Sequence, residues 1–323
     1  MKTWIKALVS FGVLGLLATL IPWSELSTAA KSASLSVWSV VLLGFLVGHF
    51  LGVVKWRLLV NAAGANLPMF AAVRCYAAGL FANLCLPSIV GGDVLRAALA
   101  GRATERAEVA ILIGVADRLI DLASLALFMV IAGAMVGDLA EAWPSRVLVT
   151  SIVVGGIAGA IALPFLLNMR LSRWPRKVRR RVGRTLVSLR ALRRSPGAAV
   201  TAVVLSVTIQ GSFVLLNAWL GHSIGIDIPL AAWFLVWPLA KLSGLLPVSL
   251  GGLGVRDATL AALLVPLGIA AAQGFVVSLL WQSVMIVGGL LCGALWWSTR
   301  ATGERLDTRT ASTAESVSSE TPA

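Results

Sequence analysis

The sequence has few charged residues, and this scarcity excludes a water-soluble globule. Only 13% of the 323 residues are charged, 58% are hydrophobic, and the mean hydropathy is +0.91. A soluble domain carries about 25% charged residues, so lipid must cover what polar side chains cannot. Apolar runs of about 20 residues recur, the length that spans a bilayer, and they lack the alternation of membrane β-strands. We therefore predict an all-α, polytopic integral membrane helix bundle with about eight spanning helices.

Cysteine and histidine are also scarce. Three cysteines, Cys75, Cys85 and Cys292, lie in apolar segments, and their odd number and wide spacing argue against a disulfide framework or a zinc site. The sequence shows no histidine-rich cluster, nucleophile elbow or phosphate-binding loop. We therefore expect no metal, no cofactor and no catalytic residue.

Acidic residues number 14 against 27 lysines and arginines, which gives a net charge of +13. Much of this excess lies in 170–194, where no acid interrupts the basic residues. Apolar residues recur there at spacings of three and four, so the segment is predicted to be a cytoplasmic amphipathic helix in the headgroup region. The basic segment is a topology signal and a candidate contact for anionic lipid. Nucleic acid is not an expected partner.

The sequence does contain two matching motifs. Leu-Pro, Gly-Gly and Arg recur at one offset of 160 residues in the segments 86–96 and 246–256. Proline cannot continue a helix and Gly-Gly permits a turn. The interval from Pro68 to Gly101 is too short for two spans and too long for one. We therefore predict, in each copy, a helix, a break and a half-length helix that returns.

Basic residues set the expected orientation. Lys55 and Arg57, with Trp56 between them, indicate the cytoplasmic end of a span at 37–54. With the other basic segments on the same side, the two motif hairpins enter from opposite faces and form inverted repeats. We predict one transmembrane domain over 1–300 and a disordered polar tail over 301–323. The other predicted spans are 5–21, 69–86, 109–136, 147–168, 197–220, 229–246 and 270–297.

Inverted repeats with broken helices are typical of secondary transporters, and the breaks mark the binding site. If Gly-Gly precedes each half-helix, free N–H groups there bind anions, and Arg96 and Arg256 add donor forks suited to phosphate. Alternatively, Arg96 pairs with Asp93, and Arg256 pairs with Asp257 or with the acids of the fourth span. The candidate substrate-binding residues are Asn83, Ser88, Gly91, Gly92, Asp93, Arg96, Asp117, Arg118, Asp121, Lys241, Ser249, Gly251, Gly252, Arg256 and Asp257.

Two of these assignments have open alternatives. Asp117 and Asp121 share one helix face with Arg118 beside them, and they either bind substrate or snorkel to the membrane edge. Lys241 either adds to the anion pocket or pairs with an acid.

The motifs resemble those of a known family. The segment 83–96, which reads N-L-C-L-P-S, then G-G-D and R, resembles a signature of the lysylphosphatidylglycerol synthase transmembrane (flippase-like) family. The segments 117–121 and 247–257 resemble its other two motifs, and the likeness covers most of 5–297. The resemblance implies a bundle with re-entrant helices that moves lipids, such as aminoacylated phosphatidylglycerol, between leaflets. We expect a stand-alone membrane domain without the aminoacyl-transferase domain of bifunctional members.

We therefore expect an inner-membrane lipid flippase-like transporter of an anionic lipid, with both termini cytoplasmic. One alternative is a membrane-embedded enzyme acting on lipid-linked substrates, with Asp93, Asp117 or Asp121 as base. Another is a scaffold that organises lipid-synthesis enzymes through 170–194. The expected partners are membrane lipids, above all anionic phospholipid; a homodimer and contacts with lipid-synthesis enzymes are compatible with the sequence.

Overall fold

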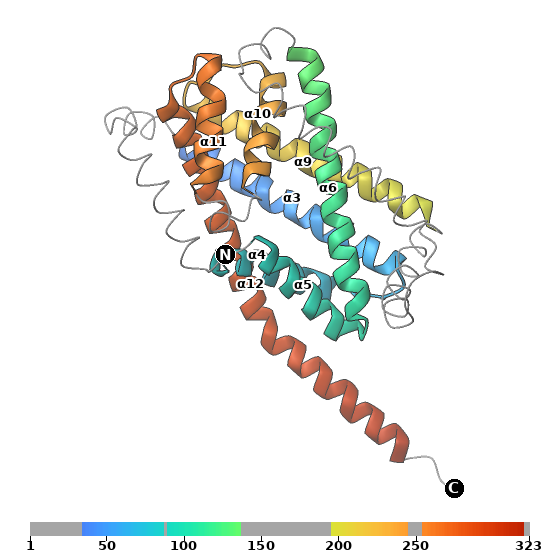
Figure 1. Ribbon diagram of the computed structural model, residues 1–323. Coiled ribbons are helices and arrows are strands. Elements are labelled where there is room, and N and C mark those ends of the chain that lie inside the picture. Colours follow the sequence, from blue (N-terminus) through green and yellow to red (C-terminus); the bar gives the residue numbers. More distant parts are fainter. Residues whose placement is uncertain (1–33, 87–88, 137–194, 245–253, 320–323) are drawn as a thin grey trace.

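The computed structural model describes residues 34–86, 89–136, 195–244 and 254–319, and these are helical apart from short connections (Figure 1). The predicted all-α class is confirmed for them. Among these described residues, three helices are long and apolar enough to cross a membrane: α3, α9 and the Ala271–Thr299 part of α12. The elements are α3 (Leu35–Ala62), α4 (Met69–Cys85), α5 (Ile89–Thr104), α6 (Ala107–Val136), α9 (Pro196–Ser223), α10 (Leu230–Ser243), α11 (Val255–Leu264), the 3₁₀ turn η3 (Val265–Leu267) and α12 (Ala271–Ser319).

Several predicted features lie outside the described residues. They are the spans at 5–21 and 147–168, the basic segment 170–194, and the motif residues Ser88, Ser249, Gly251 and Gly252. The number of spans and the orientation in the membrane stay predictions.

Both motif segments lie between short helices. As described, α4 and α5 have 17 and 16 residues, and α10 and α11 have 14 and 10. Each is shorter than the ~20 residues that cross a bilayer. The helix break predicted between 87 and 92 falls slightly earlier, because α4 ends at Cys85 and α5 begins at Ile89.

α3 and α9 end in the same way. Gly64 and Gly225 adopt left-handed backbone, with φ of +86° and +84°. In each case the N–H of the next residue donates a hydrogen bond to the carbonyl oxygen five residues earlier. These bonds run from Ala65 to Val60 at 3.2 Å and from Ile226 to Gly221 at 3.0 Å. These are Schellman ends, in which glycine takes the left-handed position without a steric penalty. The glycines of the two ends are 161 residues apart, so the likeness between the halves extends beyond the motifs.

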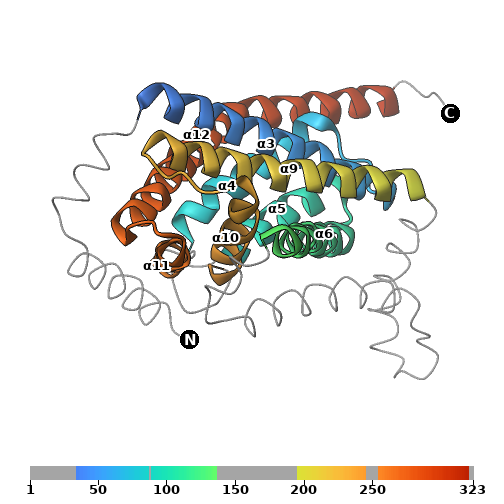
Figure 2. The ribbon, with the colours of Figure 1, turned by 90° about the horizontal axis from the view of Figure 1, so that it is seen from above.

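α3 and α9 lie side by side and run antiparallel in both views (Figures 1 and 2). Glycines allow this close approach: a Cβ on Gly48 would meet the Phe213 ring at 2.5 Å, and one on Gly44 would meet Leu216 at 2.9 Å. Small residues at helix contacts are how membrane bundles associate, because lipid tails are as apolar as the side chains. An antiparallel central pair is the arrangement that inverted repeats require.

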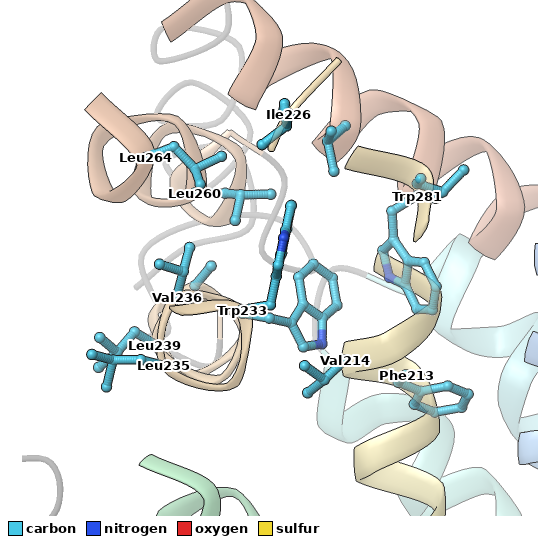
Figure 3. Packing of buried hydrophobic residues seen from close by; sticks show 14 of the residues in the cluster. Phe213, Val214, Ile226, Trp233, Leu235, Val236, Leu239, Leu260, Leu264 and Trp281 are labelled. Carbon is cyan, nitrogen blue, oxygen red and sulfur yellow. The ribbon is translucent and has the colours of Figure 1, made fainter. Parts of the chain in front are cut away.

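The larger hydrophobic core joins α9, α10, α11 and α12 (Figure 3). Trp281 of α12 contacts Trp237 edge-on, with ring centroids 5.2 Å apart, and Phe213 at 5.8 Å. These spacings lie in the range that aromatic pairs prefer. The packing fixes the second hairpin, α10–α11, against the central helices.

The backbone of α12 stays helical through 301–319, where the polar composition predicts a disordered tail. This stretch contains no proline that would interrupt the helix. The continuation extends beyond the bundle (Figure 1).

Candidate functional site

The first hairpin closes where two glycines meet. A Cβ on Gly79 of α4 would come within 2.8 Å of the Gly92 carbonyl oxygen, and one on Gly92 would overlap the Gly79 carbonyl oxygen. Asn83 completes the contact, since its Oδ1 accepts a hydrogen bond from the Gly92 N–H at 3.0 Å. The prediction that Gly91 and Gly92 precede the half-helix is therefore wrong: both lie in the first turn of α5. The Gly92 N–H, predicted to be free for an anion, is bonded to Asn83.

Arg96 lies in the second turn of α5 and is only 3% exposed. Its guanidinium carbon sits 4.7 Å from the ring centroid of Trp56 and 4.9 Å from that of Tyr76. Nη2 lies 3.2 Å from Oδ2 of Asp117 and 3.4 Å from Oδ1 of Asp93. The pair with Asp93 that the sequence suggested is present, but the shorter ion pair is with Asp117 across the helix interface. Ring faces and carboxylates together stabilise the buried cation.

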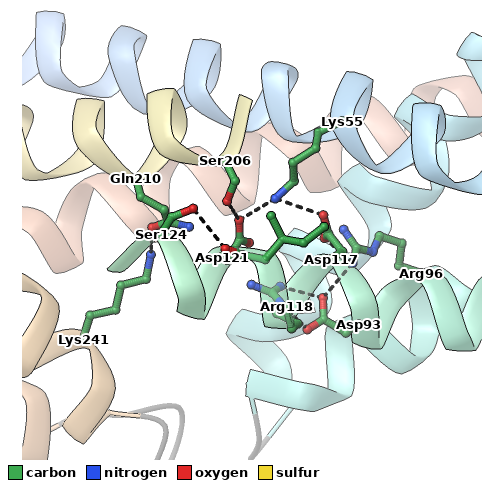
Figure 4. A network of polar contacts seen from close by, with 11 residues as sticks. Lys55, Asp93, Arg96, Asp117, Arg118, Asp121, Ser124, Ser206, Gln210 and Lys241 are labelled. Atoms are coloured by element: carbon green, nitrogen blue, oxygen red, sulfur yellow. Dashed lines mark hydrogen bonds and ion pairs between the residues drawn. The ribbon is translucent and has the colours of Figure 1, made fainter. Parts of the chain in front are cut away.

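Three charged residues of α6 continue this network (Figure 4). Asp117 and Asp121 both bind Lys55 of α3; Nζ is 3.0 Å from Oδ1 of Asp117 and hydrogen-bonds Asp121. Asp121 also accepts a hydrogen bond of 2.5 Å from Ser206 of α9. Arg118 donates from Nε and Nη2 to the two carboxylate oxygens of Asp93, both at 2.7 Å. The ion-pair network thus comprises Lys55, Asp93, Arg96, Asp117, Arg118 and Asp121.

The burial of this network settles where its acids point. The side chains of Asp117 and Asp121 are 4% and 14% exposed, so they face the interior of the bundle and do not snorkel outward. Lys55 and Trp56, predicted to mark a membrane edge, are 2% and 0% exposed. α3 continues to Ala62 and places both residues in the protein core, and their depth in the membrane stays a prediction.

The second hairpin presents Arg256 from the first turn of α11. Its Nη2 donates to Oε1 of Gln282 at 2.6 Å and to Oδ1 of Asp257 at 3.1 Å, and Nη1 lies 3.2 Å from Sδ of Met285. Asp257 also accepts hydrogen bonds from the Gly254 N–H at 2.9 Å and from Ser278. Of the two structural alternatives for Arg256, the described contacts match the pair with Asp257.

The two arginines face corresponding positions. Ser278, Gln282 and Met285 of α12 follow Asp117, Asp121 and Ser124 of α6 by 161 residues each. Arg96 and Arg256 are offset by 160. In each half, the arginine therefore faces corresponding positions on the next long helix, which is α6 for Arg96 and α12 for Arg256. The two aspartates at these positions of α6 are replaced by neutral side chains on α12.

Lys241 of α10 has charged residues of both halves in its neighbourhood. Its Nζ donates to Oε1 of Gln210 on α9 at 2.6 Å and sits 5.7 Å from the Phe213 ring centroid (Figure 4). It is within electrostatic range of Arg118, Asp121 and Arg256. Among the described residues no carboxylate lies within ion-pair distance, so the predicted pairing of Lys241 with an acid is not seen there.

Two partners on α9, Ser206 for Asp121 and Gln210 for Lys241, were not predicted from the sequence. A third buried polar residue, Asn217, donates to a backbone carbonyl of its own helix. Ser206, Gln210 and Asn217 are buried, at 0%, 4% and 0% exposure, in a span otherwise rich in apolar residues. Their spacing of four and seven places them on one helix face. That polar stripe was the available signal. In the described part of the chain, no group of three histidines, cysteines or acids could hold a metal ion.

Comparison with known families agrees with this arrangement. No curated protein matched the chain. A family model described as the lysylphosphatidylglycerol synthase TM region matches residues 3–293, which include both hairpins and the helices that bear their partners. The predicted resemblance is thereby confirmed: the chain belongs to the family of the lysylphosphatidylglycerol synthase transmembrane region.

Proposed function

We propose that the protein is a lipid flippase-like transporter that moves an anionic, phospho- or aminoacylated lipid between the leaflets of a bacterial-type inner membrane. The observation that carries the proposal is the gathering of cations on the two hairpins and on the helices packed against them. A cation at the centre of a bilayer costs about 2.5–3.5 kcal/mol even on the permissive insertion scale. Because they are costly, ionisable residues inside a membrane bundle are by default candidates for a substrate or ion pathway. Those cations are Lys55, Arg96, Arg118, Lys241 and Arg256.

Arg118 offers an entry for a lipid headgroup. Its side chain is 45% exposed, whereas that of its partner Asp93 is 18% exposed. A guanidinium binds phosphate in the same two-pronged geometry that it uses for a carboxylate. A lipid phosphate can therefore take the place of the Asp93 carboxylate without rearranging Arg118.

An apolar groove of about 330 Å³ supplies space for an acyl chain. It lies between α6 and α10, the same helices that carry Asp121 and Lys241. Phe128, at one end of the groove, follows Asp121 by seven residues, which is ~10 Å along a helix. A lipid with its headgroup at the charged network therefore has an apolar channel for its tail within reach. The lining residues are Phe128, Ile131, Ala132, Met135, Leu230, Ala231 and Phe234.

Leaflet exchange in reconstituted vesicles tests the proposal. The purified protein is inserted into liposomes that contain a labelled anionic phospholipid, and exchange is compared with that in protein-free liposomes. Arg118→Gln removes the exposed fork, so the rate should fall about 10-fold, the equivalent of one charge-assisted hydrogen bond. Arg102→Gln is the matched control, since it removes an exposed cation from the last turn of α5. Absence of protein-dependent exchange for every anionic lipid would contradict the proposal.

A further inference from the structure

The positive and negative charges in the described interior do not cancel. In the ion-pair network, the cations Lys55, Arg96 and Arg118 match three aspartates. In the second half, Arg256 is matched by Asp257. Among the described charged residues around these pairs, Lys241 is the remaining cation, and the neutral amide of Gln210 is its hydrogen-bond acceptor. Two further cations, Arg57 and Arg74, belong to other contacts: Arg57 donates to the Leu67 carbonyl oxygen, and Arg74 lies over the Phe70 ring.

Among the residues that the structure describes, no carboxylate lies within ion-pair distance of Lys241. Glu105, Glu108 and Asp227 are exposed on the described surface. The segment 245–253, which follows α10, contains no acidic residue. The acids at 25, 138 and 141 fall in predicted loops, and those at 304, 307, 315 and 320 fall in the predicted polar tail. One carboxylate, that of Asp121, lies within electrostatic range of Lys241, but it already binds Lys55. Three cations, Lys55, Arg118 and Arg256, lie within the same range. One positive charge is therefore left for a ligand.

We propose that Lys241 binds the phosphate of the transported lipid, and that the site is matched to a phosphodiester headgroup of net charge −1. This inference rests on the function proposed above and specifies its substrate class. A buried charge is stabilised by one opposite charge with good hydrogen bonds. A phosphomonoester carries about −1.5 to −2 at neutral pH and would leave excess negative charge. A zwitterionic headgroup would leave the lysine charge uncancelled.

Gln210 holds the lysine when no lipid is bound. Its Oε1 accepts from Nζ at 2.6 Å, and the Phe213 ring covers the ammonium group from another side. A lysine ammonium has three donors, so Nζ can keep Gln210 while it binds a phosphate oxygen. Two different substitutions should therefore both remove the net positive charge available to a ligand. Lys241→Gln removes the ammonium group, and Gln210→Glu neutralises it with a fixed carboxylate.

Two measurements test the inference. The first is leaflet exchange of labelled phosphatidylglycerol, phosphatidic acid and phosphatidylcholine, which carry a monoanionic phosphodiester, a phosphomonoester and a zwitterion. The second is the rise in Tm of the detergent-purified protein on adding each lipid, because a ligand that binds only the folded state raises Tm. Wild-type protein should exchange phosphatidylglycerol about 10-fold faster than the other two lipids, equivalent to one charge-assisted hydrogen bond, and should show a larger rise in Tm with it. Lys241→Gln and Gln210→Glu should both lose that preference, and Arg102→Gln should keep it.

The outcomes separate this inference from the proposed function. Equal handling of phosphatidylglycerol and phosphatidic acid by the wild type, or wild-type behaviour of Lys241→Gln, would overturn the inference while transport stands. Selective Tm stabilisation by phosphatidylglycerol, lost in both variants but without exchange, would support the charge match and overturn transport. Gln210→Glu guards against misfolding as an explanation, since it gives the lysine a stronger partner.

Discussion

Arg118 of α6 holds Asp93 of α5 through two parallel hydrogen bonds of 2.7 Å, one to each carboxylate oxygen. This fork is the most exposed ion pair of the network, and it ties the returning helix of the first hairpin to its neighbour. Its two hydrogen bonds are short and parallel, but a competing anion can reach the guanidinium and replace the carboxylate. That combination suits a contact that a substrate must replace.

The fork should contribute little to folding. In a double-mutant cycle of Arg118→Gln and Asp93→Asn, we expect a coupling energy of about 0.5–1 kcal/mol, because the guanidinium is nearly half exposed and water in the proposed headgroup pathway screens the pair. Unfolding of the four proteins in mixed detergent measures it. A coupling of several kcal/mol would show that the fork serves mainly as a structural clamp.

Lys55 should contribute far more. Lys55→Gln leaves Asp117 and Asp121 without their shared cation, and breaking a buried pair in this way costs about 3–5 kcal/mol. The same unfolding assay measures the loss. Adding Asp121→Asn to Lys55→Gln removes one stranded carboxylate and should recover part of the stability; no recovery would count against the shared-cation geometry.

Gly92 should tolerate no side chain. Gly92→Ala places a methyl group on the Gly79 carbonyl oxygen and against Asn83, so the hairpin must open, at a cost of about 1–3 kcal/mol. Gly197→Ala is the control, because Gly197 is exposed near the start of α9 and nothing lies within 4 Å of its added methyl. Equal stability of the two variants would refute the close α4–α5 crossing.

Filling the apolar groove should slow transport without unfolding the protein. Ala231→Trp puts an indole into the space between α6 and α10, and we expect lipid exchange to fall about 10-fold, which corresponds to roughly 1.4 kcal/mol of lost binding. Val203→Trp is the matched control, since Val203 is 48% exposed on α9, away from the groove lining. An unchanged exchange rate in Ala231→Trp, with an unchanged Tm, would remove the groove from the transport path.

The sequence was most informative where local chemistry decides the structure. The break after Cys85 was predictable because proline cannot continue a helix, and the shared face of Asp117 and Asp121 followed from their spacing. Both hold in the structure.

Tertiary packing decided the rest. Lys55 follows an apolar run, as a lysine at the membrane edge does. Its pairing with Asp117 and Asp121 becomes visible only when the position of α6 is known. The Gly-Gly pair indicated backbone freedom, whereas the structure uses Gly92 for close approach to Gly79. The main partner of Arg96 lies 21 residues away on another helix, beyond the reach of any local pattern.

The neutral side chains of Ser278 and Gln282 on α12 indicate the role of the two aspartates of α6. Ser278 and Gln282 stand where the other half has Asp117 and Asp121, yet Arg256 is buried and hydrogen-bonded there through Gln282 and Asp257. The chain thus contains a second version of this helix junction, in which the facing positions of α12 are neutral and the carboxylate comes from Asp257 on the same helix as the arginine. A half-helix that carries an arginine can therefore pack against its neighbour without two aspartates on that neighbour. The main effect of Asp117 and Asp121 is on the electric potential inside the bundle, and their effect on the helix packing is smaller.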